Sequence, residues 1–163
     1  VGAGQTKTFL RYQLIVQGTK EEGKRVQLKD MTVTAANASG LCSNNGLSFV
    51  CDSMTFTQCW NGVEAKNTKG RLINCVITQC VGCGISCGEN TLLELEGSQT
   101  KVCGNATDGN GHLYGMCTFY TSSIIHLLFP LTKESVFSTH NNGGGDYGGE
   151  GVIETVPESS SRK

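Results

Sequence analysis

Three consecutive stretches of the chain repeat one pattern at an interval of about 22 residues. They read MTVTAANASGLCS from Met31, MTFTQCWNGVEA from Met54 and CVITQCVGCGISC from Cys75. Each begins with a short run in which apolar and polar residues alternate and then continues through a turn. A second strand-like piece follows, and it begins at a glycine and an aliphatic residue. A repeat of this length is typical of stacked supersecondary units, so it constrains the fold more than any other feature of the sequence.

Apolar and polar residues alternate by two within each repeat, and turn pairs such as Asn45-Gly46 separate the short pieces. None of these pieces can bury its apolar side alone, whereas stacked copies bury a continuous column about one strand spacing apart. Helical repeats are excluded by the alternation, and leucine-rich repeats by the missing leucine and asparagine framework. The pattern therefore predicts an all-β fold, a parallel β-solenoid with about 22 residues per coil.

The chain of 163 residues is long enough for one core, and we expect a single domain over residues 1–156. Residues 1–25 are expected to form an N-terminal cap, because an uncovered end coil exposes its backbone edge and its core. Regular coils are expected over residues 26–105, and irregular coils with a C-terminal cap over residues 106–156. Residues 157–163 are expected to be a disordered tail.

The 13 basic and 14 acidic residues nearly balance, so nothing marks a binder of nucleic acid or of an anionic membrane. The longest apolar run, IIHLLF from Ile124, is too short to cross a bilayer, and the first residues, VGAGQTKTF, lack a signal-peptide core. We therefore expect neither a signal peptide nor a transmembrane segment. The missing initial Met indicates either a processed piece or an excised domain of a longer protein.

Nine cysteines crowd the chain, and their positions predict small buried residues that stack in columns. Cys59 and Cys80 each follow a Gln at the same corner, and Cys103 is expected near that corner in the next coil. Cys83 aligns with Ser39 in a turn. A disulfide and a metal site stay open as alternatives, although a lone Cys-x-x-Cys is weak evidence for zinc. The odd total argues against a secreted disulfide framework, so we expect folding in a reducing compartment.

The stretch LINCVITQCVGCGIS resembles the coils of right-handed parallel β-helices of the pectate-lyase-like superfamily, and this resemblance covers roughly residues 26–105. The stretch LTKESVFSTHNNGGGDYGGEGVIETV resembles segments of virion-associated proteins of large DNA viruses that infect algae. In size and layout the chain is similar to the C-terminal cell-wall-degrading domain of a chlorella-virus virion-associated protein. The resemblance implies a right-handed β-helix that acts on an algal cell-wall polysaccharide at virus entry. It also implies a protein that is released from a larger precursor, folds in the reducing host cytoplasm and is then part of the virion.

β-Helix enzymes that act on polysaccharides use a groove along one sheet face. Hydrolysis there needs two carboxylates, and elimination from a uronic acid needs a base and a cation such as calcium. Stacking the repeats brings Asp30 and Glu94 near one column, with Asp52 and Arg71 close by. The three carboxylates are the candidate acid, base or calcium ligands, and Arg71 is the candidate base or carboxylate anchor. A solvated surface and a plain binding surface stay open as alternatives.

Three further residues are candidates for sugar contacts. Trp60, the only tryptophan, lies in a turn where its ring could stack on a sugar or simply cover a coil corner. Glu64 and Lys66 point outward on the following strand, as sugar contacts or as an ordinary exposed pair. No two of the histidines, His112, His126 and His140, have metal-ligand spacing, and no metal-ligating residues are predicted. Calcium stays a candidate cofactor, with the loop around Asp108 as one place for it and a plain turn as the alternative.

The leading prediction is a virion-associated β-helix that degrades algal cell-wall polysaccharide. Whether it is an enzyme stays open, as does the choice between a polysaccharide lyase and a glycoside hydrolase, because the paired-aspartate and Arg-x-Pro-x-x-Arg motifs of such enzymes are missing. The alternatives are a non-catalytic carbohydrate-binding module and a structural virion component. Nucleic acid and membrane are not expected partners, and a homotrimer is one way to cover an exposed edge.

Overall fold

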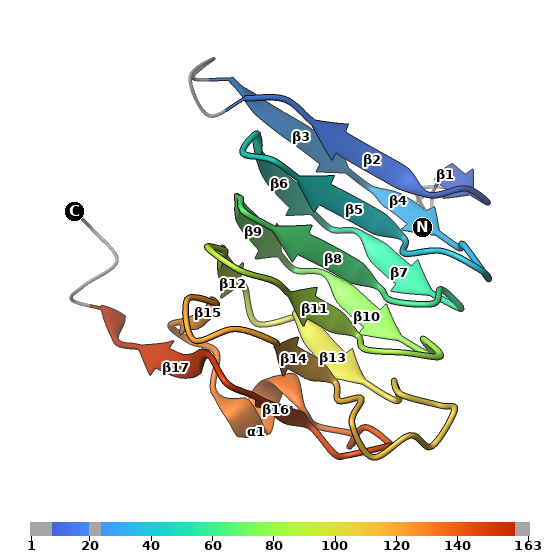
Figure 1. Ribbon diagram of the computed structural model, residues 1–163, viewed down its shortest axis with the longest axis vertical. Coiled ribbons are helices and arrows are strands. Elements are labelled where there is room, and N and C mark those ends of the chain that lie inside the picture. The colour runs from blue at the N-terminus through green and yellow to red at the C-terminus, as the bar shows by residue number, and fades with distance from the viewer. Residues whose placement is uncertain (1–7, 20–23, 159–163) are drawn as a thin grey trace, which may run out of the picture.

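A computed structural model describes residues 8–19 and 24–158, which form three parallel β-sheets wound around one core (Figure 1). The first sheet has five strands, in the order β1 (Thr8–Leu10), β4 (Met31–Val33), β7 (Thr55–Thr57), β10 (Val76–Thr78) and β13 (Lys101–Cys103). The second has six, in the order β2 (Leu14–Gln17), β5 (Leu41–Asn44), β8 (Val63–Lys66), β11 (Ile85–Cys87), β14 (Met116–Thr118) and β16 (Tyr147–Gly149). The third also has six, in the order β3 (Arg25–Lys29), β6 (Ser48–Asp52), β9 (Lys69–Ile73), β12 (Leu92–Glu96), β15 (Ile124–Leu128) and β17 (Val152–Val156).

Each of the first five coils contributes one strand to each sheet, the last coil contributes β16 and β17 only, and the strand pairs are parallel. Strand partners in the regular part lie about 23 residues apart, as Lys69 and Leu92 do. The predicted all-β parallel β-solenoid is therefore confirmed.

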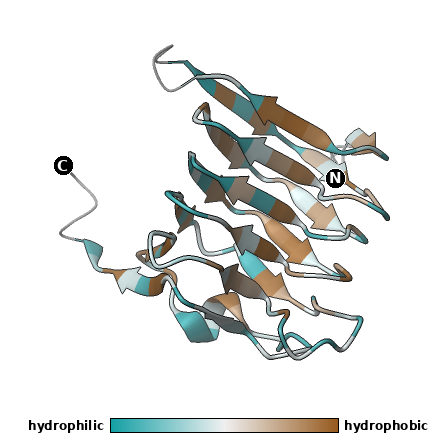
Figure 2. Cartoon of the chain, in the orientation of Figure 1, coloured by the Kyte–Doolittle hydropathy of each residue, from teal (hydrophilic) through white to brown (hydrophobic). Residues whose placement is uncertain are grey.

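The core consists of inward side chains that stack in columns from coil to coil. In the first sheet Val33, Phe56 and Ile77 are in register, and each is fully buried. Figure 2 shows apolar and polar residues alternating along the strands, as a sheet with one buried face requires. Burial of these columns supplies the main stabilising free energy, at about 25 cal/mol for each Å² of apolar surface removed from water.

Most corners of the regular coils turn through a residue with positive φ. The set comprises Asp30, Ser53, Asn74 and Gly97 between the third and first sheets, Gln58, Gln79 and Gly104 between the first and second, and Asn45, Asn67 and Asn90 between the second and third. This left-handed conformation is uncommon outside glycine, although Asn and Asp adopt it more readily than most residues. The corners therefore repeat at fixed places and hold the strand register constant.

At the beginning of the chain the structure differs from the predicted cap over residues 1–25. β1 pairs in parallel with β4, and β2 pairs in parallel with β5, so residues 8–17 belong to a first full coil. The reason is that Leu10, Leu14 and Val16 continue the inward columns. No described element covers the outer edge of this coil (Figure 1), and residues 1–7 and 20–23 lie outside the described residues.

Beyond β13 the coils become irregular, because Leu92 pairs with Ile124 and the intervening segment is longer than one repeat. The helix α1 (Lys133–Val136) contacts β13 and occupies the place of a sixth strand in the first sheet. Val136 and its neighbours Leu131 and Phe137 are buried, so α1 closes this end of the core. Within the described ranges no helix is long and apolar enough to cross a membrane. Residues 159–163 of the expected tail lie outside the description.

The cysteine columns are present in part. Cys59 and Cys80 are fully buried at the same corner, as predicted. Cys103 is not in this column, because it pairs with Thr78 on the outward side of the first sheet. Asn105 takes the corner instead, where its Oδ1 accepts a hydrogen bond from the N–H of Cys80 at 3.1 Å.

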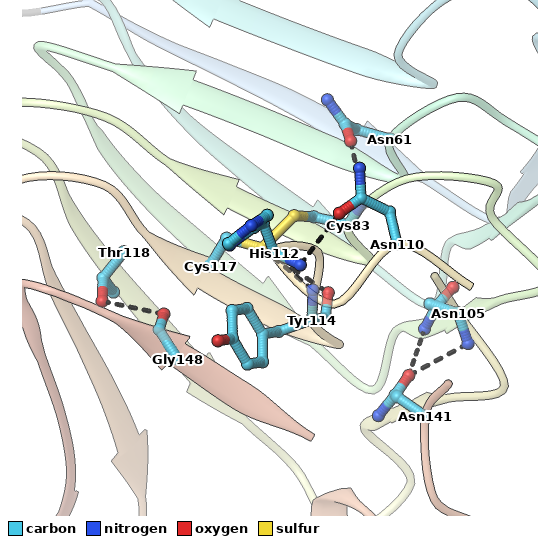
Figure 3. The surroundings of a disulfide bond; sticks show 10 residues. All are labelled: Asn61, Cys83, Asn105, Asn110, His112, Tyr114, Cys117, Thr118, Asn141 and Gly148. Carbon is cyan, nitrogen blue, oxygen red and sulfur yellow. Dashed lines mark hydrogen bonds between the residues drawn. A yellow bond between two sulfur atoms is a disulfide. The ribbon is translucent and has the colours of Figure 1, made fainter. Parts of the chain in front are cut away.

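Cys83 is joined to Cys117 by a disulfide, as Figure 3 shows, so it is not a stacked thiol. Both residues are about 1% exposed, and the bond ties the turn before β11 to β14 in the next coil. Disulfides are typical of oxidising compartments, so this bond does not favour the expected folding in a reducing one.

Candidate functional site

Three columns of outward side chains cover the outer face of the third sheet. The central column consists of Gln27, Val50, Arg71, Glu94, His126 and Glu154. The column on the side of the second sheet consists of Arg25, Ser48, Lys69, Leu92, Ile124 and Val152. The column on the other side contains Lys29, Asp52, Ile73 and Glu96. The face is therefore basic over the first coils and apolar to acidic over the last ones.

Two shallow cavities lie between these columns. One has a volume of about 250 Å³, and its charged lining residues are Arg25, Lys69, Arg71 and Glu94. The other has a volume of about 380 Å³, and its charged lining residues are Arg25, Lys29, Asp52 and Arg71. Because Arg25, Val50 and Arg71 line both, the two cavities form one groove across neighbouring strands. We call it the Arg71 groove and define it by its six charged residues, Arg25, Lys29, Asp52, Lys69, Arg71 and Glu94.

Ion pairs fix the side chains of this groove. Arg71 donates to Glu94 Oε2 from Nη2 at 2.9 Å and from Nε at 3.1 Å, and it reaches Glu96 from Nη1 at 3.4 Å. Glu94 is only 14% exposed, and Lys69 Nζ lies 3.9 Å from its other oxygen. A guanidinium held in this way presents its plane in one orientation, which suits recognition of a planar anionic group.

The second carboxylate of the groove is paired as well. Lys29 Nζ lies 3.5 Å from Asp52 Oδ2, and Ser53 donates its hydroxyl to Asp52 Oδ1 at 2.8 Å. Four basic side chains thus face two carboxylates within the groove. The balance is positive, so the groove is electrostatically suited to an anionic ligand.

The predicted catalytic residues are brought together only in part. Asp52, Arg71 and Glu94 all line the Arg71 groove, as the stacking argument requires. Asp30 does not line either cavity. It occupies the corner after β3 with φ of 56°, and its N–H donates to the carbonyl of Asp52 at 3.1 Å. The expected column of Asp30 with Glu94 is therefore wrong, because corner residues stack with corner residues and Glu94 pairs with Arg71 inside the strands.

The three candidate sugar contacts lie away from this groove, at or near the second sheet. Trp60 is 47% exposed at the corner between β7 and β8, and its indole lies over the next corner, close to Gly82. Glu64 accepts a hydrogen bond from Ser39 Oγ at 2.5 Å, and Lys66 Nζ lies 3.2 Å from Glu89. The structure therefore separates these residues from Asp52 and Glu94.

Several charged residues of this face were not predicted from the sequence. Arg25 is the last residue of the segment expected to be a cap, and Lys29 lies in the first expected regular coil, although both alternate with Val26 and Leu28 as strand residues do. His126 Nε2 lies 3.1 Å from Glu154 Oε1 in the central column. No sequence signal aligns His126 with Glu94, because the repeat interval changes between β12 and β15.

The long loop from residue 104 to residue 115 has the contacts of a plain turn. Asp108 Oδ1 accepts from the N–H of Asn110 at 2.9 Å, and Asn110 Oδ1 accepts from the N–H of His112 at 3.0 Å. Over the described part of the chain, no group of three or more His, Cys, Asp or Glu side chains could hold a metal ion. Calcium binding stays a prediction.

Comparison of the chain with protein-family models, with curated proteins and with solved structures gave no match. The resemblances to pectate-lyase-like β-helices and to algal-virus proteins therefore have no support from a family or a relative. What the structure establishes is a parallel β-solenoid, a fold that is consistent with carbohydrate-active and with structural roles.

Proposed function

We propose that this chain is a polysaccharide-binding β-solenoid domain that holds an anionic sugar chain in the Arg71 groove. The observation that supports this most directly is the shared lining of the two cavities by Arg25 and Arg71. Guanidinium groups bind carboxylate and sulfate groups in a bidentate manner, and such groups recur along acidic polysaccharides.

The shape of the site also supports a polymeric ligand. The groove is open and runs across β3, β6, β9 and β12, so a chain longer than the groove can pass through it. Enclosed pockets are typical of sites for small ligands, whereas this groove is open to solvent. The ion pair between Arg71 and Glu94 keeps one arginine in place before the ligand arrives, which lowers the entropic cost of binding.

Cleavage of algal cell-wall polysaccharide during virus entry is a second candidate. The observation that favours cleavage is that Asp52 and Glu94 line the same groove on either side of Arg71. Their strands are separated by β9, which puts their Cα atoms about 10 Å or more apart at about 4.8 Å per strand. Inverting glycosidases hold their two carboxyl groups about 6.5–9.5 Å apart, so the Asp52 and Glu94 side chains would have to lean toward each other from these Cα positions. The algal wall and the virion enter this candidate from the sequence resemblance alone.

The binding proposal is tested by affinity electrophoresis in gels that contain polygalacturonate or, separately, a neutral β-glucan. We expect retardation by the acidic polymer only, and an affinity at least tenfold lower in Arg71→Ala and in Arg25→Ala. The matched control is Lys66→Ala, which removes a paired surface cation from the second sheet. No retardation of the native chain, or an equal loss in the control, would rule out the Arg71 groove as the binding site.

Cleavage is tested with isolated algal cell walls by following reducing ends and the absorbance of unsaturated uronates, with and without calcium. Loss of sugar release in Asp52→Asn or Glu94→Gln that exceeds any loss of binding, with circular dichroism unchanged, supports an enzyme. The absorbance then distinguishes elimination from hydrolysis. Binding without any release leaves the non-catalytic module.

A further inference from the structure

The two ends of the solenoid carry opposite charges. The first coil, built from β1, β2 and β3, has four basic side chains and one carboxylate among its described residues, namely Arg11, Lys24, Arg25, Lys29 and Asp30. Among the described residues, the last coil, built from α1, β16 and β17, has one basic side chain and five carboxylates, namely Lys133, Glu134, Asp146, Glu150, Glu154 and Glu158. The net charge of the whole chain is only −1, so the two signs are separated along the axis of the solenoid.

Both ends also leave strand edges without a neighbour among the described residues. β2 and β3 are the first strands of the second and third sheets, and β16 and β17 are the last. A free edge presents a row of unpaired N–H and C=O groups that another strand can bind. At the first coil the core is uncovered too, because Leu28 is half-buried whereas Cys51, its neighbour in the same column, is fully buried.

We propose that copies of this chain stack head to tail, with the first coil of one copy continuing the second and third sheets of another. In this arrangement β3 of one copy pairs in parallel with β17 of its partner, and β2 pairs with β16. Such a contact joins two different surfaces, so it repeats and builds a chain of copies.

The register of the third sheet shows how the charges would meet. If the column order continues across the junction, Gln27 of one copy lies opposite Glu154 of its partner, and Arg25 and Lys29 lie diagonally on either side. Diagonal pairs of this kind already occur within the sheet. Lys69 reaches Glu94 at 3.9 Å and Arg71 reaches Glu96 at 3.4 Å, each across neighbouring strands and one column over.

The same charge distribution disfavours symmetric pairing of like ends. Two first coils brought together would oppose basic groups, and two last coils would oppose carboxylates, so both contacts are repulsive. The attraction between unlike ends acts over a short range in salt, since the Debye length is about 8 Å at physiological ionic strength. Head-to-tail contact is therefore expected to weaken as salt is added.

A charge swap tests the proposal by sedimentation velocity. The native chain should sediment faster as its concentration rises at low salt, and this dependence should be lost at high salt. In the third sheet, Arg25→Glu with Lys29→Glu makes the β3 end acidic, and Glu150→Lys with Glu154→Lys makes the β17 end basic. Each double variant alone should remain monomeric, because its two ends then carry the same sign. An equimolar mixture should assemble again, because every junction then joins unlike ends.

Lys66→Glu in the middle of the second sheet is the control, and it should assemble like the native chain. Thermal melting of each variant establishes that it is folded. The proposal is overturned by a native chain that is monomeric at every concentration tested, or by a mixture of folded variants that fails to assemble. A salt-insensitive trimer that both double variants still form would also overturn it.

Discussion

Asn105 and Asn141 join two successive coils through their side chains, with Asn105 Nδ2 donating to Asn141 Oδ1 at 3.0 Å (Figure 3). Asn105 is fully buried, and its Nδ2 also donates to the carbonyl of Ile77 at 2.9 Å. Asn141 in turn donates to the carbonyl of Val102 at 2.9 Å. The two amides therefore make full-strength hydrogen bonds to backbone groups, at a corner where the Cys59 thiol offers the carbonyl of Val33 only a weak donor at 3.7 Å.

Asn105→Ala should lower the free energy of unfolding by about 3 kcal/mol, because a buried backbone group left without a partner costs about 1–3 kcal/mol. For a chain of this size the melting temperature should fall by about 10 °C, at about 2–4 °C per kcal/mol. Calorimetry measures this, with Asn110→Ala in the exposed loop as the control. Equal melting of the two variants would contradict the structural role.

Gly70→Ala should destabilise the fold by about 1–3 kcal/mol, because a Cβ at this inward position would overlap the ring of Phe49. Phe49→Leu should itself destabilise the core but should remove most of the penalty of Gly70→Ala. Urea unfolding of the two single variants and the double variant gives the coupling, which we expect to exceed about 1 kcal/mol. Strictly additive effects would show that the two residues do not compete for the same space.

Cys83→Ala combined with Cys117→Ala should cost about 4 kcal/mol on the chain-entropy estimate for a separation of 34 residues. Reducing agent should lower the stability of the native chain toward that of the double variant, slowly, because both sulfur atoms are buried. The double variant itself should be insensitive to reducing agent. Guanidinium unfolding with and without dithiothreitol measures both effects, and an unchanged midpoint of the native chain after reduction would refute them.

The buried thiols should make the fold sensitive to alkali. Burial raises the pKa of Cys87 to about 12 and raises that of Cys51 as well, from a usual value near 9. In the unfolded chain these thiols ionise first, so their stabilising contribution is complete below about pH 9 and is lost as the pH rises toward 12. Each such thiol should lower the free energy of unfolding by about 1.4 kcal/mol per pH unit in this window.

Cys87→Ala tests the alkaline dependence, since Ala65 already occupies the neighbouring place in the same column. Urea unfolding at pH 8, 9 and 10 gives the free energy of unfolding at each pH. In this variant that free energy should fall less steeply with pH, because about one proton fewer is released on unfolding. If the free energy of unfolding depends on pH equally in the native chain and the variant, groups other than Cys87 cause the loss of stability in alkali.

The sequence predicts the solenoid because its repeat is nearly exact where the core is regular. Val33, Phe56 and Ile77 can be aligned by eye, and the structure pairs them in the same order. The first two strands are missed because Leu10 and Leu14 carry no copy of the turn motif, so their alternation alone does not place them in register. The disulfide is missed because Cys117 lies beyond the lengthened segment, where spacing no longer indicates proximity.

The residues of the candidate site are predicted only where the repeat is regular. Arg71, Asp52 and Glu94 are found because they lie on strands of regular coils, where a count of residues gives the column. Asp30 is assigned to the wrong column because it lies just beyond the end of β3. The positive φ at this corner turns its side chain away from the strand columns, and a count of residues does not reveal this. His126 and Glu154 depend on a tertiary pairing that follows a break in the repeat, and local sequence does not encode that pairing.

The lengthened segment between β12 and β15 has a consequence for how a chain of this kind tolerates change. Leu92 and Ile124 stay in register although the loop between β13 and β14 carries additional residues. An inserted residue inside a strand would instead move every following side chain to the opposite face. New sequence can therefore be grafted at this corner, whereas the strands permit replacement of residues but no change in their number.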